Sequence, residues 1–175
     1  MTAPVVAGRV SLQDLQAYLH YAPEDGVFTW KISPSDRVRA GSQAGGVKKT
    51  KAGKVRWSIG IKGVQYTASR LAWLYMTGEW PENLVDHIDG DPLNQRWVNL
   101  RDINTKGNAE NQRKAPGHNK VSGLLGVGWS KARQQWRANI STDGKRVHLG
   151  YFDLASDAHE AYLRAKRMLH TACTI

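Results

Sequence analysis

The spacing of hydrophobic residues changes several times within the first eighty residues, and each spacing predicts a different element. Leucines three or four positions apart predict a short helix, with Ser11 as its N-cap. Alternation of apolar and polar residues then predicts half-buried strands. The predicted elements are a helix at residues 11–20, strands at 27–32, 55–61 and 64–68, and a helix at 70–77. Residues 33–54 are rich in Ser, Gly, Lys and Arg, which predicts a loop.

The second half of the chain contains two groups of short elements separated by a polar stretch. Residues 84–88 and 100–103 predict two strands, and a helix is expected from about Thr105. Residues 113–122 lack apolar periodicity and contain Pro116-Gly117, which predicts a linker. Three alternating strands and a helix follow the linker. The order of elements therefore predicts an α+β protein.

Charge is distributed unevenly along the 175 residues. The chain has 25 Lys and Arg against 15 Asp and Glu, which gives a net charge of +10 and a pI near 9.9. Residues 31–70 hold ten basic residues and one acid, and residues 113–148 hold eight basic residues and one acid. Residues 71–112 between them hold seven acids and three basic residues. Two blocks that can contact phosphates therefore flank a centre that can hold a cation, which makes polyanion binding the first hypothesis.

Composition excludes several classes of protein. Cys173 is the single cysteine, so neither a disulfide framework nor a cysteine-rich zinc site is expected. No apolar run reaches the ~20 residues that span a bilayer, and the first residues lack the layout of a signal peptide. We therefore expect a cytoplasmic protein, in a bacterial host if a phage encodes it, with no membrane partner.

The acidic centre contains residue types that suit phosphodiester hydrolysis. Its strands and helix would bring together the carboxylate of Asp86, the imidazole of His87 and two amides three residues apart, Asn108 and Asn111. Carboxylate and amide oxygens, here from Asp86 and Asn108, are ligands for a hard cation such as Mg²⁺. An imidazole can take a proton from the attacking water, and an Asn oxygen can hold its other ring nitrogen. Each polar residue of this centre has an ordinary explanation when it is taken alone. Residues 89–92 can form a turn, Asn104 or Thr105 can cap a helix, and a single His is usually structural.

Three short runs in this centre resemble the HNH (ββα-metal) nucleases, in particular the phage and intron homing endonucleases with Asn at the third motif position. The runs are Asp-His-Ile-Asp-Gly-Asp at 86–91, Asn-Leu-Arg at 99–101, and Thr105 followed by Asn108 and Asn111. The spacings from His87 to Asn99 and from Asn99 to Asn108 also match. The resemblance implies that His87 is the general base and that Asn99 positions it. It further implies that Asp86 and Asn108 bind one divalent metal ion, Mg²⁺ being expected and Mn²⁺ the alternative.

The resemblance extends into the N-terminal third of the chain. Phage relatives open with Tyr-x-Pro-x-x-Gly-x-x-x-Trp, as residues 21–30 do here. A later His-Arg-Leu-Ala-Trp segment followed by Thr-Gly-x-x-Pro is similar to residues 69–81, except that Ser69 replaces the His. The replacement leaves the four motif positions intact but removes any role that the family gives this His. A packing helix is an equally good explanation of the Arg70–Trp73 segment.

Residues 123–170 resemble the ethylene-response-factor (APETALA-type) DNA-binding domain, a three-stranded antiparallel sheet packed on one helix. The similar pieces are Gly126-Val127, residues 136–140, residues 149–152 and residues 157–162. Alternation places Val127, Ala138 and Tyr151, among other apolar residues, on the face toward the helix. The opposite face would carry polar residues, and in the resembled family that face enters the major groove. Gly128 and Ser130 stand where plant members tend to have Arg, so the recognised base sequence does not transfer.

Double-stranded DNA is therefore the expected partner, with no small-molecule cofactor and with the protein a monomer or weak homodimer. Arg and Asn side chains can read base edges, and Lys and Arg can reach phosphates. The residues predicted to contact DNA are Lys48, Lys49, Lys51, Arg56, Arg101, Arg113, Lys114, Lys131, Arg133, Arg137, Asn139, Lys145, Arg146 and His148.

The sequence as a whole predicts a sequence-specific, metal-dependent DNA endonuclease of the homing type. Its predicted segments are a DNA-contacting region at 1–82, an HNH nuclease core at 83–112, a linker at 113–122 and a DNA-binding domain at 123–175. A catalytically silent DNA-binding regulator on the same scaffold is the alternative. A general degradative nuclease is a third possibility.

Overall fold

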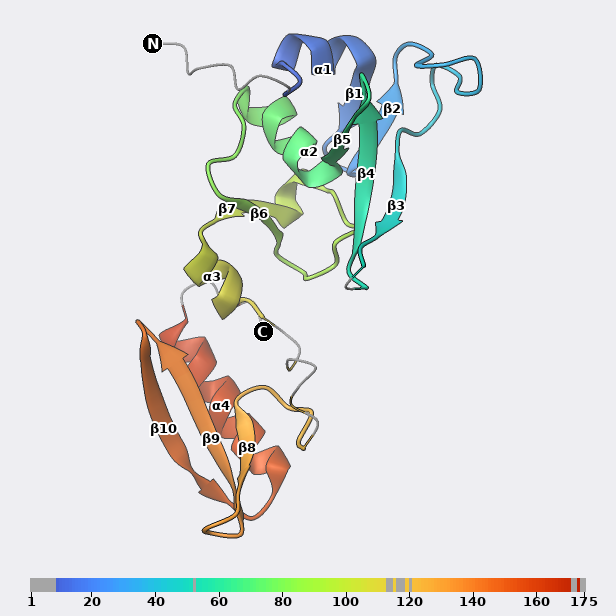
Figure 1. Cartoon of the computed structure of the whole chain (residues 1–175). Coiled ribbons are helices and arrows are strands. Elements are labelled where there is room, and N and C mark those ends of the chain that lie inside the picture. Colours follow the sequence, from blue (N-terminus) through green and yellow to red (C-terminus); the bar gives the residue numbers. More distant parts are fainter. Residues whose placement is uncertain are drawn as a thin grey trace. The chain divides into compact units, whose positions relative to one another are not determined.

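The computed structural model describes residues 9–51, 53–112, 115, 119, 121–170 and 173. Its backbone packing divides the chain after Ile103 into two compact units, which we call unit 1 (through Ile103) and unit 2 (from Asn104). Helices and small antiparallel sheets make up both units (Figure 1), so the predicted α+β class is confirmed. This division by packing does not test the four functional segments expected from the sequence (1–82, 83–112, 113–122 and 123–175), which stay a prediction.

Unit 1 begins with a short helix and a hairpin. Helix α1 (Leu12–Tyr18) starts at Ser11, whose side-chain oxygen accepts a hydrogen bond from the Asp14 N–H. Strands β1 (Leu19–Ala22) and β2 (Val27–Trp30) pair antiparallel. The helix predicted at residues 11–20 is thus shorter than expected, because Leu19 already has extended backbone and belongs to β1.

A three-stranded sheet and a second helix follow in unit 1. The sheet has the order β3 (Gly46–Lys49), β4 (Val55–Ile61), β5 (Val64–Thr67), and α2 (Ala68–Thr77) runs directly from it. Gly78 ends α2 in the left-handed conformation. Strand β3 lies within residues 33–54, for which the sequence predicts a loop. Its side chains are largely exposed and do not alternate in burial, so no strand pattern is visible there.

The hydrophobic core of unit 1 joins α1, the β1–β2 hairpin, β4 and α2. Tyr21 and Phe28 stack in this core with ring centroids 4.6 Å apart, and the Tyr75 ring meets both edge-on. Its buried side chains include Leu15, Leu19, Tyr21, Phe28, Ile59, Ile61, Leu71, Leu74 and Leu100. Leu100 begins the strand at residues 100–103, which pairs with the strand that carries Asp86 and His87. The core therefore also holds this strand pair in place.

The motif hairpin consists of β6 (Leu84–His87) and β7 (Leu100–Ile103), with a 3₁₀ turn, η1 (Trp97–Asn99), before β7. The two strands pair antiparallel with Leu84 opposite Ile103 and His87 opposite Leu100. Both strands therefore occur where the sequence predicts them, with a polar loop between them.

Unit 2 contains a short helix and a separate sheet–helix layer. Helix α3 (Thr105–Glu110) comes first, followed by a sheet of order β10 (Lys145–Phe152), β9 (Gln135–Thr142), β8 (Val127–Ser130). Helix α4 (Ala155–Leu169) packs on one face of this sheet (Figure 1). The interface is apolar and comprises Leu125, Val127, Ala138, Ile140, Ala158 and Tyr162. The predicted three-stranded sheet on one helix is confirmed.

A β-bulge in β10 overturns one part of the predicted side-chain pattern. The register to β9 shifts between His148 and Gly150, so Leu149 is an extra residue and Tyr151 stands opposite Arg137. The expectation that Tyr151 faces α4 is therefore wrong, and the ring lies on the polar face of the sheet. Its ring centroid is 4.6 Å from that of His148, and the Arg133 guanidinium lies 4.7 Å from the Tyr151 ring centre.

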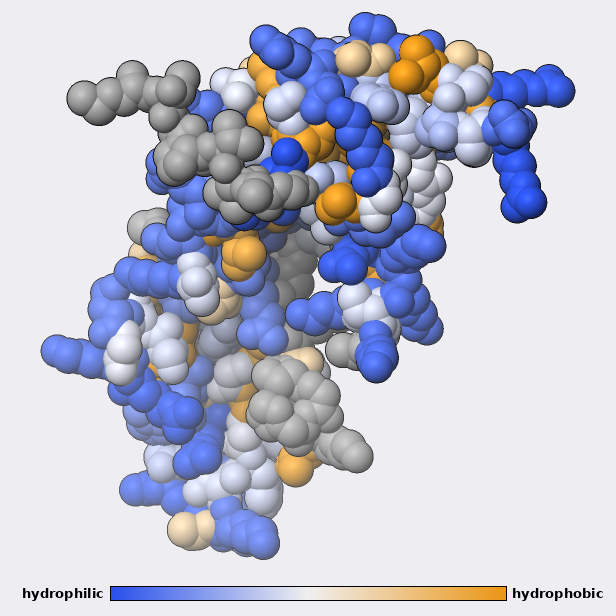
Figure 2. Space-filling model, turned by 45° about the horizontal axis from the view of Figure 1, so that its top comes forward, coloured by the Kyte–Doolittle hydropathy of each residue, from blue (hydrophilic) through white to orange (hydrophobic). Residues whose placement is uncertain are grey.

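The surface of the described residues is mainly polar. On the face shown in Figure 2, hydrophilic side chains predominate and hydrophobic ones form small separate spots. Within the part of the chain that the structure describes, no helix is long and apolar enough to cross a membrane.

Candidate active site and nucleic-acid interface

Asp86, the predicted metal ligand, lies in the middle of the motif hairpin. The register of β6 and β7 places it directly opposite Arg101. The Arg101 Nε and Nη2 groups donate to the same carboxylate oxygen, Oδ2, over 3.2 and 3.0 Å. The pair is largely shielded from solvent, with 15% of the Asp86 side chain exposed. Arg101, predicted to contact DNA, therefore binds the carboxylate next to the predicted base, and its contact with DNA stays a prediction.

His87, the predicted general base, has a partner that the sequence does not reveal. Its Nε2 lies 3.3 Å from Oε1 of Gln95, a residue of the loop between β6 and β7. Gln95 is buried, with 4% of its surface exposed, and its Nε2 donates to the Pro92 carbonyl over 2.7 Å. Because the Pro92 carbonyl can only accept, this bond orients the Gln95 amide so that its oxygen faces the imidazole.

Asn99, predicted to position His87 directly, instead organises the loop. Its Oδ1 accepts from the Asp89 N–H over 2.9 Å, and its Nδ2 donates to Asp89 Oδ1 and to the Asn94 carbonyl over 3.0 and 2.9 Å. The side chain is buried and uses both ends of its amide in these bonds. Any effect of Asn99 on the imidazole is thus transmitted through the loop that carries Gln95.

Asp89 stabilises the same loop from the opposite side. Its carboxylate accepts from the Asp91 N–H over 2.8 Å and from Asn94 Nδ2 over 2.6 Å, in addition to the Asn99 amide. Partial burial would raise the pKa of Asp89, but these three hydrogen bonds and the nearby His87 hold it below its usual value. The loop is therefore built around an ionised carboxylate.

The β1–β2 hairpin supports the loop on the other side of Gln95. The Tyr21 hydroxyl donates to the Gln95 carbonyl over 2.6 Å, and Arg96 Nε donates to the Glu24 carbonyl over 2.6 Å. The Trp97 N–H donates to the Pro23 carbonyl over 2.9 Å. Burial raises the pKa of the Tyr21 phenol, which keeps it a donor at all physiological pH values.

Gly26 lets the β1–β2 turn lie directly against the backbone of Gln95 and Arg96. It adopts the left-handed region at φ 73°. A Cβ there would lie 2.4 Å from the backbone of Gln95 and Arg96. The stretch from Tyr21 to Trp30, which the sequence links to phage nucleases, therefore holds the loop behind His87.

Asn108, the other predicted metal ligand, is an exposed residue of α3 in unit 2. Asn104 caps this helix by accepting from the Gly107 N–H over 2.9 Å. Asp86 and Asn108 offer the oxygen donors that hard divalent ions prefer, so their chemistry fits the expected metal. No cluster of three or more His, Cys, Asp or Glu suited to a metal occurs among the described residues. The assignment of these two ligands stays a prediction.

The basic residues predicted to contact DNA in unit 1 lie at one hairpin of the sheet. Lys48 of β3 stands opposite Arg56 of β4, and both are exposed, as are Lys49 and Lys51. Like charges opposite one another on a sheet repel. Bound phosphate would relieve this repulsion.

The polar face of the unit 2 sheet carries most of the remaining predicted contacts. His148 stands opposite Asn139, Arg146 opposite Ser141, and Tyr151 opposite Arg137, as side chains on one face do. His148 Nδ1 lies 3.3 Å from Asn139 Oδ1. The exposed residues Lys131, Arg133 and Lys145 lie near the strand ends. Arg113 and Lys114, also predicted to contact DNA, lie outside the described residues.

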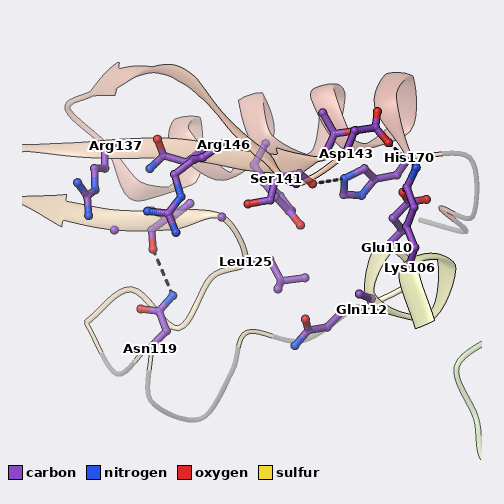
Figure 3. Close-up of a pocket in the computed structure, with 18 residues that line it drawn as sticks. Lys106, Glu110, Gln112, Asn119, Leu125, Arg137, Ser141, Asp143, Arg146 and His170 are labelled. Atoms are coloured by element: carbon purple, nitrogen blue, oxygen red, sulfur yellow. Dashed lines mark hydrogen bonds and ion pairs between the residues drawn. The ribbon is translucent and has the colours of Figure 1, made fainter.

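A hollow of about 700 Å³ borders this polar face within unit 2. Figure 3 shows Arg137 and Arg146 extending from the strands toward the side on which Asn119 lies. Helix α3 contributes Lys106 and Glu110 to the same hollow. Lys106 pairs with Asp143, and this partner raises the pKa of the Lys106 ammonium. Part of the predicted DNA-reading face is thus a concave, charged surface rather than an open sheet.

Comparisons with known proteins found a family model, a relative and a solved structure that are similar to this chain. A sequence model described as HNH endonuclease matches residues 66–110. The chain is 39% identical to "Protein 3.8" of Escherichia phage T7 over 99 residues, which is 56% of this chain and 79% of that protein. The chain belongs to the HNH endonuclease family. Among solved structures, the HNH homing endonuclease I-HmuI aligns over 93% of both chains, with 18% identity and a TM-score of 0.42.

The HNH match covers α2, the motif hairpin and α3, and therefore contains all four predicted motif residues. Its range ends at residue 110, before the sheet of unit 2. The resemblance of that sheet to the ethylene-response-factor domain stays a prediction. Gln95 lies inside the HNH range but had no sequence signal of its own, because its role depends on how the loop folds back onto His87.

Proposed function

We propose that this HNH protein is a divalent-metal-dependent endonuclease that cuts double-stranded DNA at selected sites. The observation that carries the proposal is the motif hairpin, in which Asp86 and His87 are the last two residues of β6 and each is held by its own polar partner. The imidazole is held by a buried amide, and the carboxylate is held by a partly buried guanidinium. This arrangement suits a general base next to a metal ligand.

The orientation of Gln95 assigns the tautomer of His87. Since the Gln95 oxygen faces Nε2, the neutral ring carries its proton on Nε2 and donates it to that oxygen. Nδ1 is then the basic nitrogen and takes the proton from the water that attacks the phosphorus. The Gln95 oxygen also favours the imidazolium that results, because its hydrogen bond from the ring N–H is stronger when the ring is charged.

Asp86 and Asn108 would hold the metal ion through oxygen atoms. When bound, such an ion supplies charge to stabilise the pentacoordinate phosphate and the leaving oxygen. Arg101, beside Asp86, adds a fixed positive charge where negative charge develops. Residues of this chain therefore account for the base, the metal ligands and a supporting cation.

The polar face of unit 2 would provide the sequence selectivity. Arg137 and Arg146 can contact guanine edges, and Asn139 can contact adenine. The nuclease hairpin itself offers few such groups, because its polar side chains bind one another. A single site per chain predicts that a monomer nicks one strand.

Nicking of supercoiled plasmid tests the proposal. We expect cleavage with Mg²⁺ or Mn²⁺, none with EDTA, and none for Asp86→Ala, whose affinity for duplex DNA should be near that of the wild type because Lys and Arg carry the binding. Asp25→Ala is the matched control, since it removes an exposed carboxylate from the β1–β2 turn. Full activity in Asp86→Ala would refute the metal-ligand assignment.

The second candidate is a catalytically silent DNA-binding regulator. The Asp86–Arg101 ion pair favours it, because a guanidinium neutralises the carboxylate that a metal would need. The same assay decides between the two. Tight duplex binding without nicking at any metal concentration would establish the regulator and exclude the nuclease.

A further inference from the structure

Two arginines that are far apart in the sequence meet on one tryptophan in unit 1. The Arg9 guanidinium carbon lies 5.5 Å from the Trp80 ring centre, and that of Arg70 lies 5.7 Å from it. We call these three residues the Arg9–Trp80–Arg70 cluster. Arg70 belongs to α2, while Trp80 lies between α2 and β6.

Hydrogen bonds fix the backbone at Arg9 in this position. The Val10 N–H donates to the Tyr66 hydroxyl over 3.0 Å, and Trp80 Nε1 donates to the Val10 carbonyl over 3.3 Å. Tyr66 and Trp80 also stack, with ring centroids 5.7 Å apart. The Val10 side chain is buried. Arg9 is therefore attached to a rigid support even though its own surface is exposed.

Arg70 is oriented from the other side. Its Nη1 donates to the Asn83 carbonyl over 3.1 Å, and its Nη2 lies 3.5 Å from the Pro81 carbonyl. These bonds occupy two of the five N–H groups that a guanidinium offers. The remaining donors can serve a ligand.

The cluster concentrates positive charge. Burial lowers the pKa of Arg70, and the neighbouring Arg9 lowers it further, while Asp102 acts in the opposite direction. The Asp102 carboxylate accepts from the backbone N–H groups of Glu82 and Asn83. Among the described residues, no carboxylate comes within ion-pair distance of Arg9 or Arg70.

We propose that the Arg9–Trp80–Arg70 cluster binds a backbone phosphate of the DNA substrate. The inference rests on the proposed endonuclease function and adds a contact that the sequence did not suggest. A phosphate accepts from two guanidiniums at once and removes the repulsion between them. The tryptophan face holds the cations without neutralising them.

The cluster lies next to the predicted catalytic strand. Arg70 binds the carbonyl of Asn83, and Asp86 comes three residues later along β6. Three strand residues span about 10 Å, which corresponds to a rise of about three nucleotides along one DNA strand. The bound phosphate would therefore lie a few nucleotides from the one that is cleaved.

Salt-dependent duplex binding tests this contact. Fluorescence anisotropy of a labelled 30-base-pair duplex would be measured with the full chain in EDTA, so that no cleavage occurs. Arg9→Met retains apolar contact with Trp80 and loses the charge. We expect a weaker affinity and a salt slope, log K against log salt, that is smaller by about one. Arg9→Lys should keep most of the wild-type slope.

Arg164→Met is the matched control, because it removes the same charge from an exposed position on α4. Should Arg9→Met melt at a lower temperature than the wild type, Arg9→Gln supplies the same loss of charge. A wild-type slope in Arg9→Met and Arg9→Gln, or an equal loss in Arg164→Met, would overturn the cluster as a phosphate site. A wild type that binds no duplex would instead refute the proposed function itself.

Discussion

The motif hairpin of unit 1 and the polar face of unit 2 both carry candidate functional residues, but they hold them in different ways. In the hairpin, Asp86, His87 and Asn99 each contact another polar side chain, and Asn99 and Gln95, the partner of His87, are buried. On the polar face, the side chains of Arg137 and Arg146 make no hydrogen bond or ion pair with another described residue.

The difference matches what each task requires. A catalytic group must be fixed close to one geometry, because a small displacement costs a large part of the rate. A DNA-reading arginine must instead adjust to the base it meets, and a prior partner would have to be displaced first. We therefore expect substitutions in the hairpin to affect the rate of cleavage, and substitutions on the polar face to affect the choice of site.

The largest effect is expected for His87→Ala. Loss of the general base should reduce the nicking rate by about 10²–10⁴-fold at saturating DNA, while the affinity for duplex stays near that of the wild type. Single-turnover kinetics on plasmid would measure the rate. His20→Ala, an exposed histidine of β1, serves as the control. Equal rates in the two variants would mean that the imidazole at 87 is not the base.

Gln95→Met should have the next largest effect, since it removes the acceptor for His87 Nε2 and keeps a side chain of similar length. A positioning role predicts a rate lower by about tenfold, together with a changed pH dependence of the rate. Gln65→Met, at an exposed position of β5, is the control. A variant that loses thermal stability but keeps the wild-type pH profile would show that Gln95 acts only in packing.

Arg137→Ala tests the role of the polar face of unit 2. If this arginine reads a base, its loss should cost about 1–3 kcal/mol of affinity for the target duplex and much less for a scrambled one. The nicking rate at saturating DNA should remain unchanged. Binding titrations on both duplexes at one salt concentration measure the difference. An equal loss on the two sequences would assign Arg137 to phosphate contact instead.

The smallest effect is expected when the pH is lowered and Asp89 becomes protonated. Because the folded-state pKa of Asp89 lies below its unfolded value, the stability it contributes is present above the unfolded pKa and is lost as the pH falls through the folded one. Melting temperatures of the wild type should therefore fall more steeply than those of Asp89→Asn between about pH 4 and pH 2. Parallel curves would show that the carboxylate does not stabilise the loop as an anion.

The sequence predicted the strands of the hairpin, its motif residues and the polar face of the unit 2 sheet. Those features follow from alternation and from short motifs, which are local. It did not predict Gln95 as the partner of His87 or Arg101 as the partner of Asp86. Both contacts depend on strand register and loop closure, which a linear pattern leaves open. Strand β3 was missed for a related reason, because its pairing with β4 involves backbone groups rather than a hydrophobic face.

The misplacement of Tyr151 had a signal that could have been used. Gly150 stands inside a strand pattern and has φ 132°, a conformation that glycine adopts readily. Glycine within a strand often marks a bulge. A bulge at this glycine predicts that Tyr151 lies on the polar face, whereas its place beside Arg137 follows from the register of β9 and β10.

The bulge at Leu149 also decides what a change in the length of this strand would do. Leu149 is the extra residue, so deleting it would leave Gly150, Tyr151 and Phe152 opposite the same partners on β9, in a regular ladder. Tyr151 would stay beside Arg137, whereas the apolar contacts of Leu149 under α4 would be lost. A one-codon deletion there would thus alter the core and leave the polar face in place. Variants with a changed polar face are accordingly better sought by substitution in β10 than by deletion at the bulge.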